Sequence, residues 1–329
     1  MNFINAYFKY WETMFNIPKH TWATPHKIIN SSDVADFLCF SNKDSDTPII
    51  INPPQAGHIS SGVDFSKGRS LVETFTKKYN NVYSWDWKDS DYSRKDDDIS
   101  TMINRMDEDI SKLNKPVILV GVCQGGWQSA IYASIFPEKV KKLILVASPI
   151  DYHKEGGLNI YTDSLPSEFF KFMVDMGLGC MNGNWIVMGY KMMHVVDRYL
   201  KDPLDMFNNI LEGKNTKKQE DFISWYDKGT SYLPGKYYLD VIEMFKDNSL
   251  IKGELKINGE NVDLSNIKCD VLVVTGQKDD ITGKDQALAI KECVKTKVKH
   301  YEIPKVGHFG SFSGGGSMKY WHNEAFQLI

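Results

Sequence analysis

The chain has 329 residues, of which 25% are charged, and its formal net charge at neutral pH is -3. This length fits one large α/β domain or two smaller ones, and the balanced charge provides neither a basic patch for nucleic acid nor an acidic tail. The five cysteines are scattered without C-x-x-C pairs, which argues against a disulfide framework or a zinc site and favours a reducing, cytoplasmic location.

The first element along the chain is an aromatic N-terminal segment, residues 1–24. It lacks the charged-then-apolar order of a signal peptide, and no run approaches 18 apolar residues, so we expect no membrane span. The aromatic side chains could form an interfacial anchor, but packing on the domain body is the favoured alternative. These side chains are Tyr7, Phe8, Tyr10, Trp11 and Phe15.

Short apolar runs then alternate with helical patterns. The runs predict strands at residues 48–52, 81–87, 116–121, 142–147 and 270–276. Such alternation, with fully apolar strands, predicts an α/β fold with a mostly parallel, doubly wound sheet covered on both faces. The alternation stops at residues 151–268, which are helical in pattern and rich in Met and aromatic residues. We therefore expect a core formed by residues 1–150 and 269–329, with residues 151–268 inserted as a helical cap.

The loop after the first of these strands, within residues 51–65 (INPPQAGHISSGVDF), is where a backbone donor for a developing oxyanion is expected. Its two prolines have no N–H to donate. The remaining candidates are the backbone amides of Gln55, Ala56 and Gly57. His58 would lie near the mouth of the site, either bonded to backbone in a turn or in contact with substrate.

The sequence GVCQG, residues 121–125, carries the strongest chemical signal. It fits the G-x-nucleophile-x-G elbow, with an apolar strand before it and the helical pattern GGWQSAIYASIF behind it. The sharp turn leaves little room for side chains at Gly121 and Gly125, and the N–H groups of a helix start favour a thiolate. Cys123 is therefore the expected nucleophile, and the Gln124 amide is one expected oxyanion donor. The alternative is a small buried cysteine that fills a strand-to-helix turn.

An acid and a histidine follow the elbow in the required order. VLVVTGQKDDIT ends a strand with Asp279 and Asp280, and EIPKVGHFGSF carries His308. Asp279 is preferred because an acid two residues before Ile281 fits the usual G-x-x-D-x-[IV] turn, which leaves Asp280 exposed or capping the next helix. His308 would take the thiol proton and later activate a second nucleophile, while Asp279 holds its tautomer. The alternative is a loop histidine without a role.

The other histidines show no spacing typical of metal ligands, so we expect no metal site. They are His20, His26, His153, His194, His300 and His322.

Taken together, these stretches resemble the polyhydroxyalkanoate synthase and intracellular depolymerase group, α/β-hydrolase-fold proteins with a cysteine nucleophile that act on 3-hydroxyacyl polyesters. The likeness runs from about Asp33 to the C-terminus. It is carried, in order, by VYSWDW, GVCQGGWQSAIYA, FPEKVKKLILVASPIDY, VDLSNIKCDVLVVTG, DDIT and VGHFGSF. The resemblance implies that Cys123 carries the acyl group, that His308 is the base and that Asp279 is its partner.

The resemblance leaves the reaction open. The pair Gly125-Gly126 is similar to synthases, particularly the short class that works with a second subunit, whereas PPQAGHIS, SPIDYH and GQKDDITGKDQ are more similar to depolymerases or to a synthase-like branch. The leading expectation is acyl transfer from a CoA thioester to a hydroxyl acceptor, because loading Cys123 exchanges one thioester for another. Hydrolysis of 3-hydroxyacyl esters by the same residues is the alternative, and a non-catalytic granule-associated protein is the third.

These three hypotheses imply a small set of partners. The substrate would be a 3-hydroxyacyl-CoA or a polyhydroxyalkanoate chain, with no bound cofactor, in the cytoplasm or at polymer granules. A second subunit, a homodimer and the acyl chain length all remain open at this point.

Overall fold

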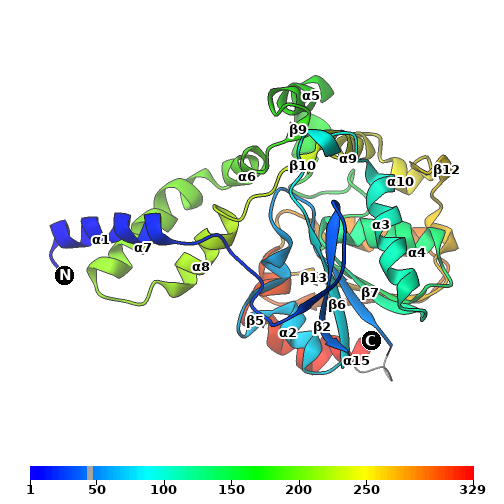
Figure 1. Cartoon of the computed structure of the whole chain (residues 1–329), viewed down its shortest axis with the longest axis horizontal. Helices are drawn as coiled ribbons and strands as arrows, with labels where there is room; N and C mark the ends of the chain where they lie inside the picture. Colours follow the sequence, from blue (N-terminus) through cyan, green and yellow to red (C-terminus); the bar gives the residue numbers. More distant parts are fainter. Residues whose placement is uncertain (43–46) are drawn as a thin grey trace.

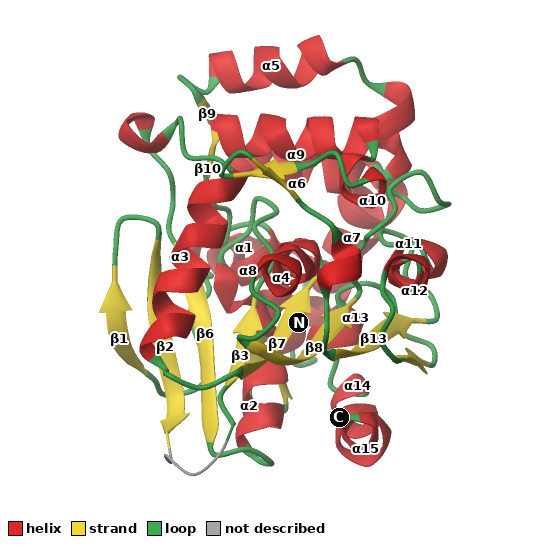
Figure 2. Ribbon diagram, turned by 90° about the vertical axis from the view of Figure 1, so that its right-hand side faces the viewer, coloured by secondary structure: helices red, strands yellow, loops and turns green. Residues whose placement is uncertain are grey.

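The computed structural model describes residues 1–42 and 47–329, and an eight-stranded sheet forms its centre. The strand order is β1-β2-β6-β3-β7-β8-β13-β14. Their bounds are β1 Lys27–Ser31, β2 Ala35–Asn42, β3 Ile49–Asn52, β6 Asn81–Trp87, β7 Val117–Val122, β8 Val140–Val146, β13 Asp270–Gly276 and β14 Val298–Ile303. Helices cover both faces (Figure 1, Figure 2): α3 (Ile99–Lys112) and α4 (Gln124–Ile135) lie on one face, and α2 (Leu71–Thr76) and α15 (Phe326–Leu328) on the other.

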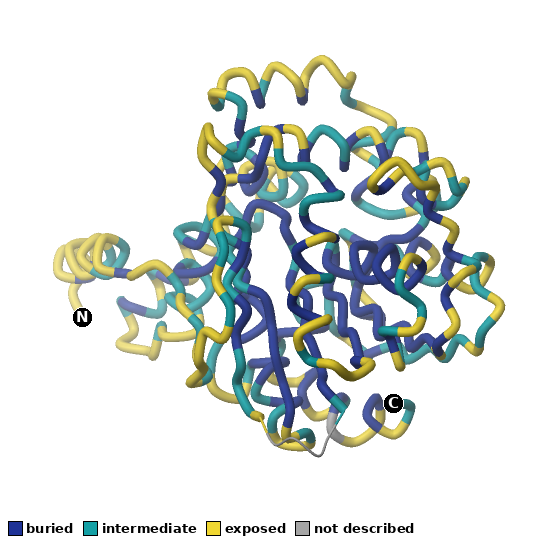
Figure 3. Tube along the Cα trace, turned by 45° about the vertical axis from the view of Figure 1, so that its right-hand side comes forward, coloured by how far each residue is buried: buried dark blue, intermediate teal, exposed yellow. Residues whose placement is uncertain are grey.

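The six strands from β6 to β14 in this order pair in parallel, which confirms the predicted mostly parallel, doubly wound sheet. The two remaining strands, β1 and β2, run antiparallel at one edge. The apolar-run criterion missed β1 because KIINS is largely exposed, and it missed β2 because buried and partly exposed residues are mixed along ADFLCFSN. By contrast, β3 and β7 are buried along their whole length, as their uninterrupted apolar sequences require (Figure 3).

Two helices of the core show how the local sequence sets where a helix begins. α4 covers residues 124–135, within one residue of the predicted helix, and is buried over most of its length. α3 begins at a capping box in which Asp98 and Thr101 exchange hydrogen bonds. No helix in the described ranges is long and apolar enough to cross a membrane.

The segment between β8 and β13 is mostly helical. α9 (Gly235–Asp247) contacts both α3 of the core and α5 (Ser167–Met176). The other helices of this segment are α6 Gly183–Met192, α7 Asp202–Leu211, α8 Lys217–Tyr226 and α10 Ser249–Lys252. Side chains from this segment form one wall of the cavity described below.

The N-terminal helix α1 (Phe3–Asn16) packs against α7 rather than against the sheet, forming an arm that extends away from the core (Figure 1). Ala6, Met206 and Ile210 are buried at this contact. The expectation that the aromatic segment packs on the domain body is therefore corrected. The helix that contacts α1 lies nearly 200 residues further along the chain. The sequence around residue 10 therefore gives no sign of which surface α1 packs on.

Candidate active site

Cys123 stands at the turn between β7 and α4. Its backbone has φ 50° and ψ -119°, a left-handed conformation that a residue with a side chain adopts only under strain. Two hydrogen bonds hold it: the Cys123 N–H donates to Val146 O at 2.8 Å, and the Gly126 N–H donates to Cys123 O at 2.9 Å. The strained turn points the thiol toward the cavity at the carboxyl end of the sheet, as in a nucleophile elbow.

Three glycines allow neighbouring strands to approach the elbow closely. A Cβ at Gly121 would collide with the backbone of Gly126, one at Gly125 with the carbonyl of Asn52, and one at Gly126 with the side chain of Ser148. The need for a glycine at Gly121 follows from the turn itself, whereas at Gly125 it arises from the end of β3. The need at Gly126 arises from the end of β8, so the glycine pair has a packing role here.

Replacing Gly125 by alanine is expected to lower the free energy of unfolding by about 1–3 kcal/mol, the usual cost of forcing a methyl group into a packed site. Urea unfolding followed by circular dichroism measures this change. Gly316→Ala is the matched control, because a Cβ at Gly316 meets no described atom within 4 Å. Equal stability of the two variants would contradict the close packing of the elbow against β3.

Asp279 and His308 are brought together at the ends of β13 and β14. His308 Nδ1 lies 3.0 Å from each carboxylate oxygen of Asp279. Asp279 also accepts hydrogen bonds from the backbone N–H groups of Ile281 and Thr282, at 3.1 and 2.9 Å. The side chains of His308 and Asp279 are only 10% and 1% exposed, so the pair is held rigidly and out of bulk water.

Cys123 and His308 line the same cavity, and Cys123 is close enough to His308 to affect its pKa. Burial by itself lowers the pKa of His308, but Asp279 and Cys123, through their charges and hydrogen bonds, raise it well above the usual 6.5. The interaction with Asp279 therefore favours the charged imidazolium form of His308.

Cys123 and His308 open onto a small cavity of about 70 Å³. Its lining is mostly apolar, and Cys123 is 8% exposed. The segment between β8 and β13 supplies Leu158, Tyr190, Trp225 and Tyr226, and the core supplies Pro54, Ala56, His58, Gln124, Ile281, Phe309 and Phe312. A second, smaller hollow adjoins it and shares Ala56, Gln124, Leu158 and Tyr190 with the first.

The predicted oxyanion donors fall into two groups. Gln124 and Ala56 line the cavity, at the start of α4 and in the loop after β3. Gln55 and Gly57 do not line it. The Gln55 side chain instead accepts a hydrogen bond from Gln128 at 2.7 Å, and the Gly57 carbonyl accepts one from the Ser231 N–H at 2.9 Å. Two of the four expected donors therefore border the cavity beside Cys123.

His58 is a buried wall of the cavity. Its Nε2 donates to the Tyr226 carbonyl at 3.1 Å, and its ring stacks on Trp225 with centroids 4.2 Å apart. Burial, and to a lesser extent Lys191, lowers the pKa of His58 to about 4, so the ring is neutral near pH 7. Of the two expected roles the backbone bond is present, and it ties the loop after β3 to α8.

Asp280, the second aspartate of the pair, points away from His308. It lies 3.1 Å from His194 Nε2, and its side chain is 57% exposed. Within the described ranges, no group of three His, Cys, Asp or Glu side chains is arranged to hold a metal ion, and the His322 side chain lies outside the described part.

Several residues of the site were not singled out by the sequence reasoning. Asn52 donates from Nδ2 to the Gly125 carbonyl at 3.1 Å and accepts from Trp87 Nε1 at 3.2 Å, so it braces the elbow. Its position directly before the two prolines of the loop could have indicated this role. Tyr190 and Trp225 carry no such signal, because aromatic residues are frequent throughout the segment in which they lie.

Comparisons with known proteins agree with the fold of the chain. A family model described as "alpha/beta hydrolase fold" matches residues 59–173, and one described as "PHB de-polymerase C-terminus" matches residues 184–327. Among solved structures, a bromoperoxidase from Bacillus anthracis aligns with a TM-score of 0.57 at 14% identity, covering 93% of this chain and 99% of the other. A monoacylglycerol lipase from Paleococcus ferrophilus aligns with a TM-score of 0.55 at 16% identity, covering 89% and 98%. The predicted α/β-hydrolase fold is confirmed.

Curated relatives carry the name of a polymerase. The poly(3-hydroxyalkanoate) polymerase subunit PhaC of Synechocystis sp. is 27% identical over 271 residues, which are 77% of this chain and 70% of that protein. The protein of the same name from Haloferax mediterranei is 22% identical over 302 residues, 87% of this chain and 60% of that protein. The chain thus spans less than two thirds of the second relative. The expected similarity to the polyhydroxyalkanoate synthase and depolymerase group is confirmed.

Proposed function

We propose that this chain is an acyltransferase that carries a 3-hydroxyacyl group on Cys123 and passes it to the hydroxyl end of a growing polyester. Two observations support the proposal together. The series Cys123, His308 and Asp279 has the order and burial of a nucleophile, a base and an orienting acid. The curated relatives described above are named as polymerases of 3-hydroxyalkanoates.

In the loading step, the Cys123 thiolate attacks the carbonyl carbon of a 3-hydroxyacyl-CoA. The oxyanion that forms is stabilised by N–H groups at Gln124 and Ala56. When the tetrahedral intermediate collapses, the bond to the CoA sulfur breaks, and His308 gives its proton to that sulfur. One thioester replaces another, so the step is nearly balanced in free energy, and a thiol is better suited to it than a serine hydroxyl.

In the transfer step, the terminal hydroxyl of the acceptor attacks the thioester on Cys123. His308, now neutral, takes the hydroxyl proton as the new ester bond forms. The bond between the acyl carbon and the Cys123 sulfur breaks, and the thiolate is again stabilised by the imidazolium. Asp279 holds Nδ1 of the ring in both steps, which leaves the other ring nitrogen facing Cys123.

Acyl transfer is favoured over hydrolysis because Cys123 is buried beneath the segment between β8 and β13. Leu158, Tyr190 and Trp225 cover a cavity of about 70 Å³ that is mostly apolar. Such a cavity limits the access of water to the acyl-enzyme. The hydroxyl end of the polyester, whose apolar chain can bind in the cavity, therefore competes with water for the acyl group with an advantage.

Hydrolysis of 3-hydroxyacyl esters is the second candidate. The same three residues would act, with water in place of the acceptor hydroxyl. The match of residues 184–327 to the family model described as "PHB de-polymerase C-terminus" is the observation that favours it.

The test offers the intact chain 3-hydroxybutyryl-CoA and, in a parallel reaction, amorphous polyhydroxybutyrate granules. CoA release is followed with a thiol reagent, and the products are separated into insoluble polyester and free 3-hydroxybutyric acid. Release of CoA with polymer formation, and an acyl adduct on Cys123 by intact mass, is the expected result.

Each other outcome is decisive. Free acid from granules without CoA-dependent polymer would overturn acyl transfer in favour of hydrolysis. Neither product from folded protein, with or without an added helper subunit, would overturn both enzymatic readings.

A further inference from the structure

The side chain of Gln124 has a buried oxygen atom that no described residue satisfies. Gln124 is the first residue of α4 and directly follows Cys123. Its Oε1 atom is buried and has no hydrogen-bond partner in the described part of the chain. A buried acceptor without a partner costs free energy, because the hydrogen bond to water is lost and nothing replaces it. An acceptor of this kind beside a nucleophile is in a position to bind a donor group of the substrate.

Gln124 borders both hollows of the site. One is the cavity of Cys123 and His308, and the other is the adjoining smaller hollow, which has a volume of about 10 Å³. A hollow of this size accommodates one water-sized group, such as a hydroxyl or a methyl. Val241, Ile242 and Phe245 of α9 form part of its wall. An acyl group on the thiol can therefore extend past the Gln124 side chain into the smaller hollow.

Two other polar atoms near this site are buried and unpaired among the described residues. They are Trp127 Nε1 and Tyr152 OH. Both side chains are fully buried, and neither lines the Cys123 cavity or the smaller hollow. Trp127 stacks on Tyr237, and Tyr152 stacks on Phe245 with ring centroids 3.7 Å apart. Both atoms thus belong to residues that lie behind the wall of the smaller hollow, where a substrate does not reach them.

The next glutamine of α4 shows the contrast. Gln128, one turn after Gln124, donates from Nε2 to Gln55 at 2.7 Å and to the Tyr237 hydroxyl at 2.8 Å. Its Oε1 accepts from Asn52 Nδ2 at 3.1 Å. The amide of Gln128 is therefore fully used within the protein. Among the described side chains that line the active-site cavity, Gln124 alone has a buried polar atom without a partner.

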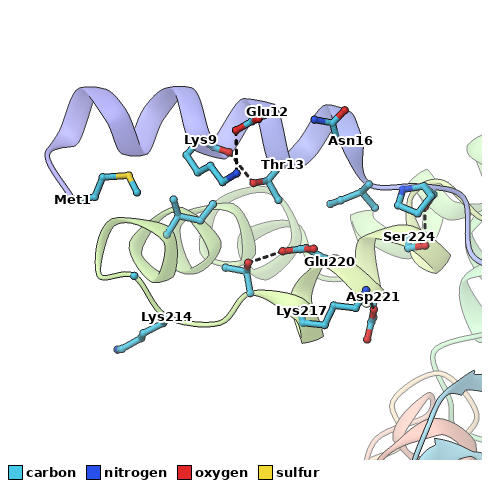
Figure 4. Close-up of a pocket in the computed structure, with 15 residues that line it drawn as sticks. Met1, Lys9, Glu12, Thr13, Asn16, Lys214, Lys217, Glu220, Asp221 and Ser224 are labelled. Carbon is cyan, nitrogen blue, oxygen red and sulfur yellow. Dashed lines mark hydrogen bonds and ion pairs between the residues drawn. The ribbon is translucent and has the colours of Figure 1, made fainter.

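A larger hollow lies on the arm, between α1 and the α7–α8 region (Figure 4). Its volume is about 440 Å³, and its charged side chains satisfy one another. Lys9 pairs with Glu12 at 3.0 Å, and Lys217 pairs with Asp221 at 2.8 Å. None of the described polar side-chain atoms that line it is both buried and unpaired. Size alone therefore does not produce the feature seen at Gln124.

The acyl group of the proposed reaction carries a donor close to its reactive carbon. In a 3-hydroxyacyl thioester the carbonyl carbon is bonded to sulfur, and the hydroxyl lies two carbons further along the chain. A hydroxyl donates one hydrogen bond, and an amide oxygen accepts it. In the proposed loading step the backbone N–H of Gln124 stabilises the carbonyl oxygen. The side chain of the same residue starts beside that N–H, so one residue can hold the acyl group at both of its oxygens.

We propose that the side-chain carbonyl of Gln124 accepts a hydrogen bond from the 3-hydroxyl of the acyl group that Cys123 receives. Gln124 is then the residue that distinguishes 3-hydroxyacyl thioesters from unsubstituted acyl thioesters. An unsubstituted acyl group leaves the buried oxygen unpaired, and a site with an unpaired polar group rejects such an analogue. This inference rests on the proposed function, because it concerns the acyl group carried by Cys123.

The test compares 3-hydroxybutyryl-CoA with butyryl-CoA, which differs only in lacking the hydroxyl. The enzyme is in excess over the thioester and CoA release is followed by rapid quench, so that the loading step is measured without chain growth. We expect the wild type to load 3-hydroxybutyryl-CoA about 10- to 100-fold faster, the effect of one hydrogen bond whose loss leaves a buried acceptor unpaired. In Gln124→Met, which keeps the backbone N–H and the side-chain length, this ratio should fall to about 3-fold or less.

Two further variants separate recognition of the hydroxyl from a general loss of activity. Gln124→Glu keeps an oxygen that accepts a hydrogen bond whether the carboxyl group is ionised or protonated, so it should restore most of the preference. Gln219→Met makes the same change on α8, where Gln219 lines neither the Cys123 cavity nor the smaller hollow, and should keep the wild-type ratio. Effects on the nucleophile cancel in the ratio, because both thioesters react at the same thiol.

Three results would contradict the role of Gln124. Equal loading of both thioesters by the wild type would overturn this inference and leave acyl transfer standing. A preference that survives in Gln124→Met but is lost in Tyr190→Phe would overturn it in favour of the Tyr190 hydroxyl, which belongs to the same cavity. Loading of neither thioester by wild type that is folded by circular dichroism would overturn the proposed function itself, and this inference with it.

Discussion

Cys123→Ala is expected to lower the rate of CoA release from 3-hydroxybutyryl-CoA by about 10⁴-fold or more, the loss typical of removing a nucleophile from a hydrogen-bonded catalytic series. The reason is that the proposed loading step forms a bond to the Cys123 sulfur, and no other cysteine lines the described cavity. A continuous assay with a thiol reagent measures the rate. Intact mass should show an acyl adduct on the wild type that is absent from the variant.

Cys180→Ala is the matched control for this prediction. Cys180 is also a free, buried cysteine, but its sulfur lies near Ser90 and the carbonyl of Asp91, outside the cavity. Its replacement should leave CoA release within a few-fold of the wild type. Retention of a tenth or more of the rate by Cys123→Ala would show that the acyl group travels by another path.

Asp279→Asn is expected to lower the same rate by about 10⁴-fold, the effect of the equivalent change in serine hydrolases. Asp279 accepts from Nδ1 of His308 in both proton transfers, and an amide in its place can present a donor and turn the ring to the wrong tautomer. Asp280→Asn is the control. Because Asp280 faces His194 and not His308, its change should have little effect on the rate.

Asp279→Asn is also expected to change how the stability of the protein depends on pH. The pKa of His308 is raised above its value in the unfolded chain, so the stabilisation by Asp279 is fully present below about pH 6.5 and is lost as the pH rises through the folded-state pKa. The free energy of unfolding should therefore differ between wild type and Asp279→Asn more at pH 6 than at pH 9. Urea unfolding at the two pH values, with the His308 ring followed by NMR, measures this. A difference that grows with pH would contradict the charged imidazolium.

Local features of the sequence were sufficient to predict where Cys123, Asp279 and His308 lie. The elbow at Cys123 depends on a strand, a tight turn and a helix that are contiguous in the chain, so the glycine spacing and the apolar runs reveal it. Asp279 and His308 lie directly after β13 and β14, and parallel strands bring their carboxyl ends to one edge of the sheet. The order of these elements therefore predicted that the three side chains lie together.

Other features depend on contacts between segments far apart in the chain. Gly126 is visible in the sequence, but its need to be glycine comes from Ser148 at the end of the next strand. Which of Gln55, Ala56 and Gly57 borders the cavity depends on how the loop after β3 is held, in part by the bond from His58 to Tyr226. Neither contact leaves a periodic signal, because each joins single residues from different elements.

The sequence by itself thus determined the parallel sheet and the positions of Cys123, Asp279 and His308 at its carboxyl edge, because each follows from short-range conformation and strand order. Only the tertiary structure decided what covers Cys123 and where the N-terminal helix packs. The cavity wall comes from Leu158, Tyr190 and Trp225, and α1 packs on α7 where Ala6, Met206 and Ile210 are buried. Both result from the burial of apolar surface between segments tens to hundreds of residues apart. The hydrophobic effect that drives this burial is non-directional, so apolar composition does not specify which surfaces meet.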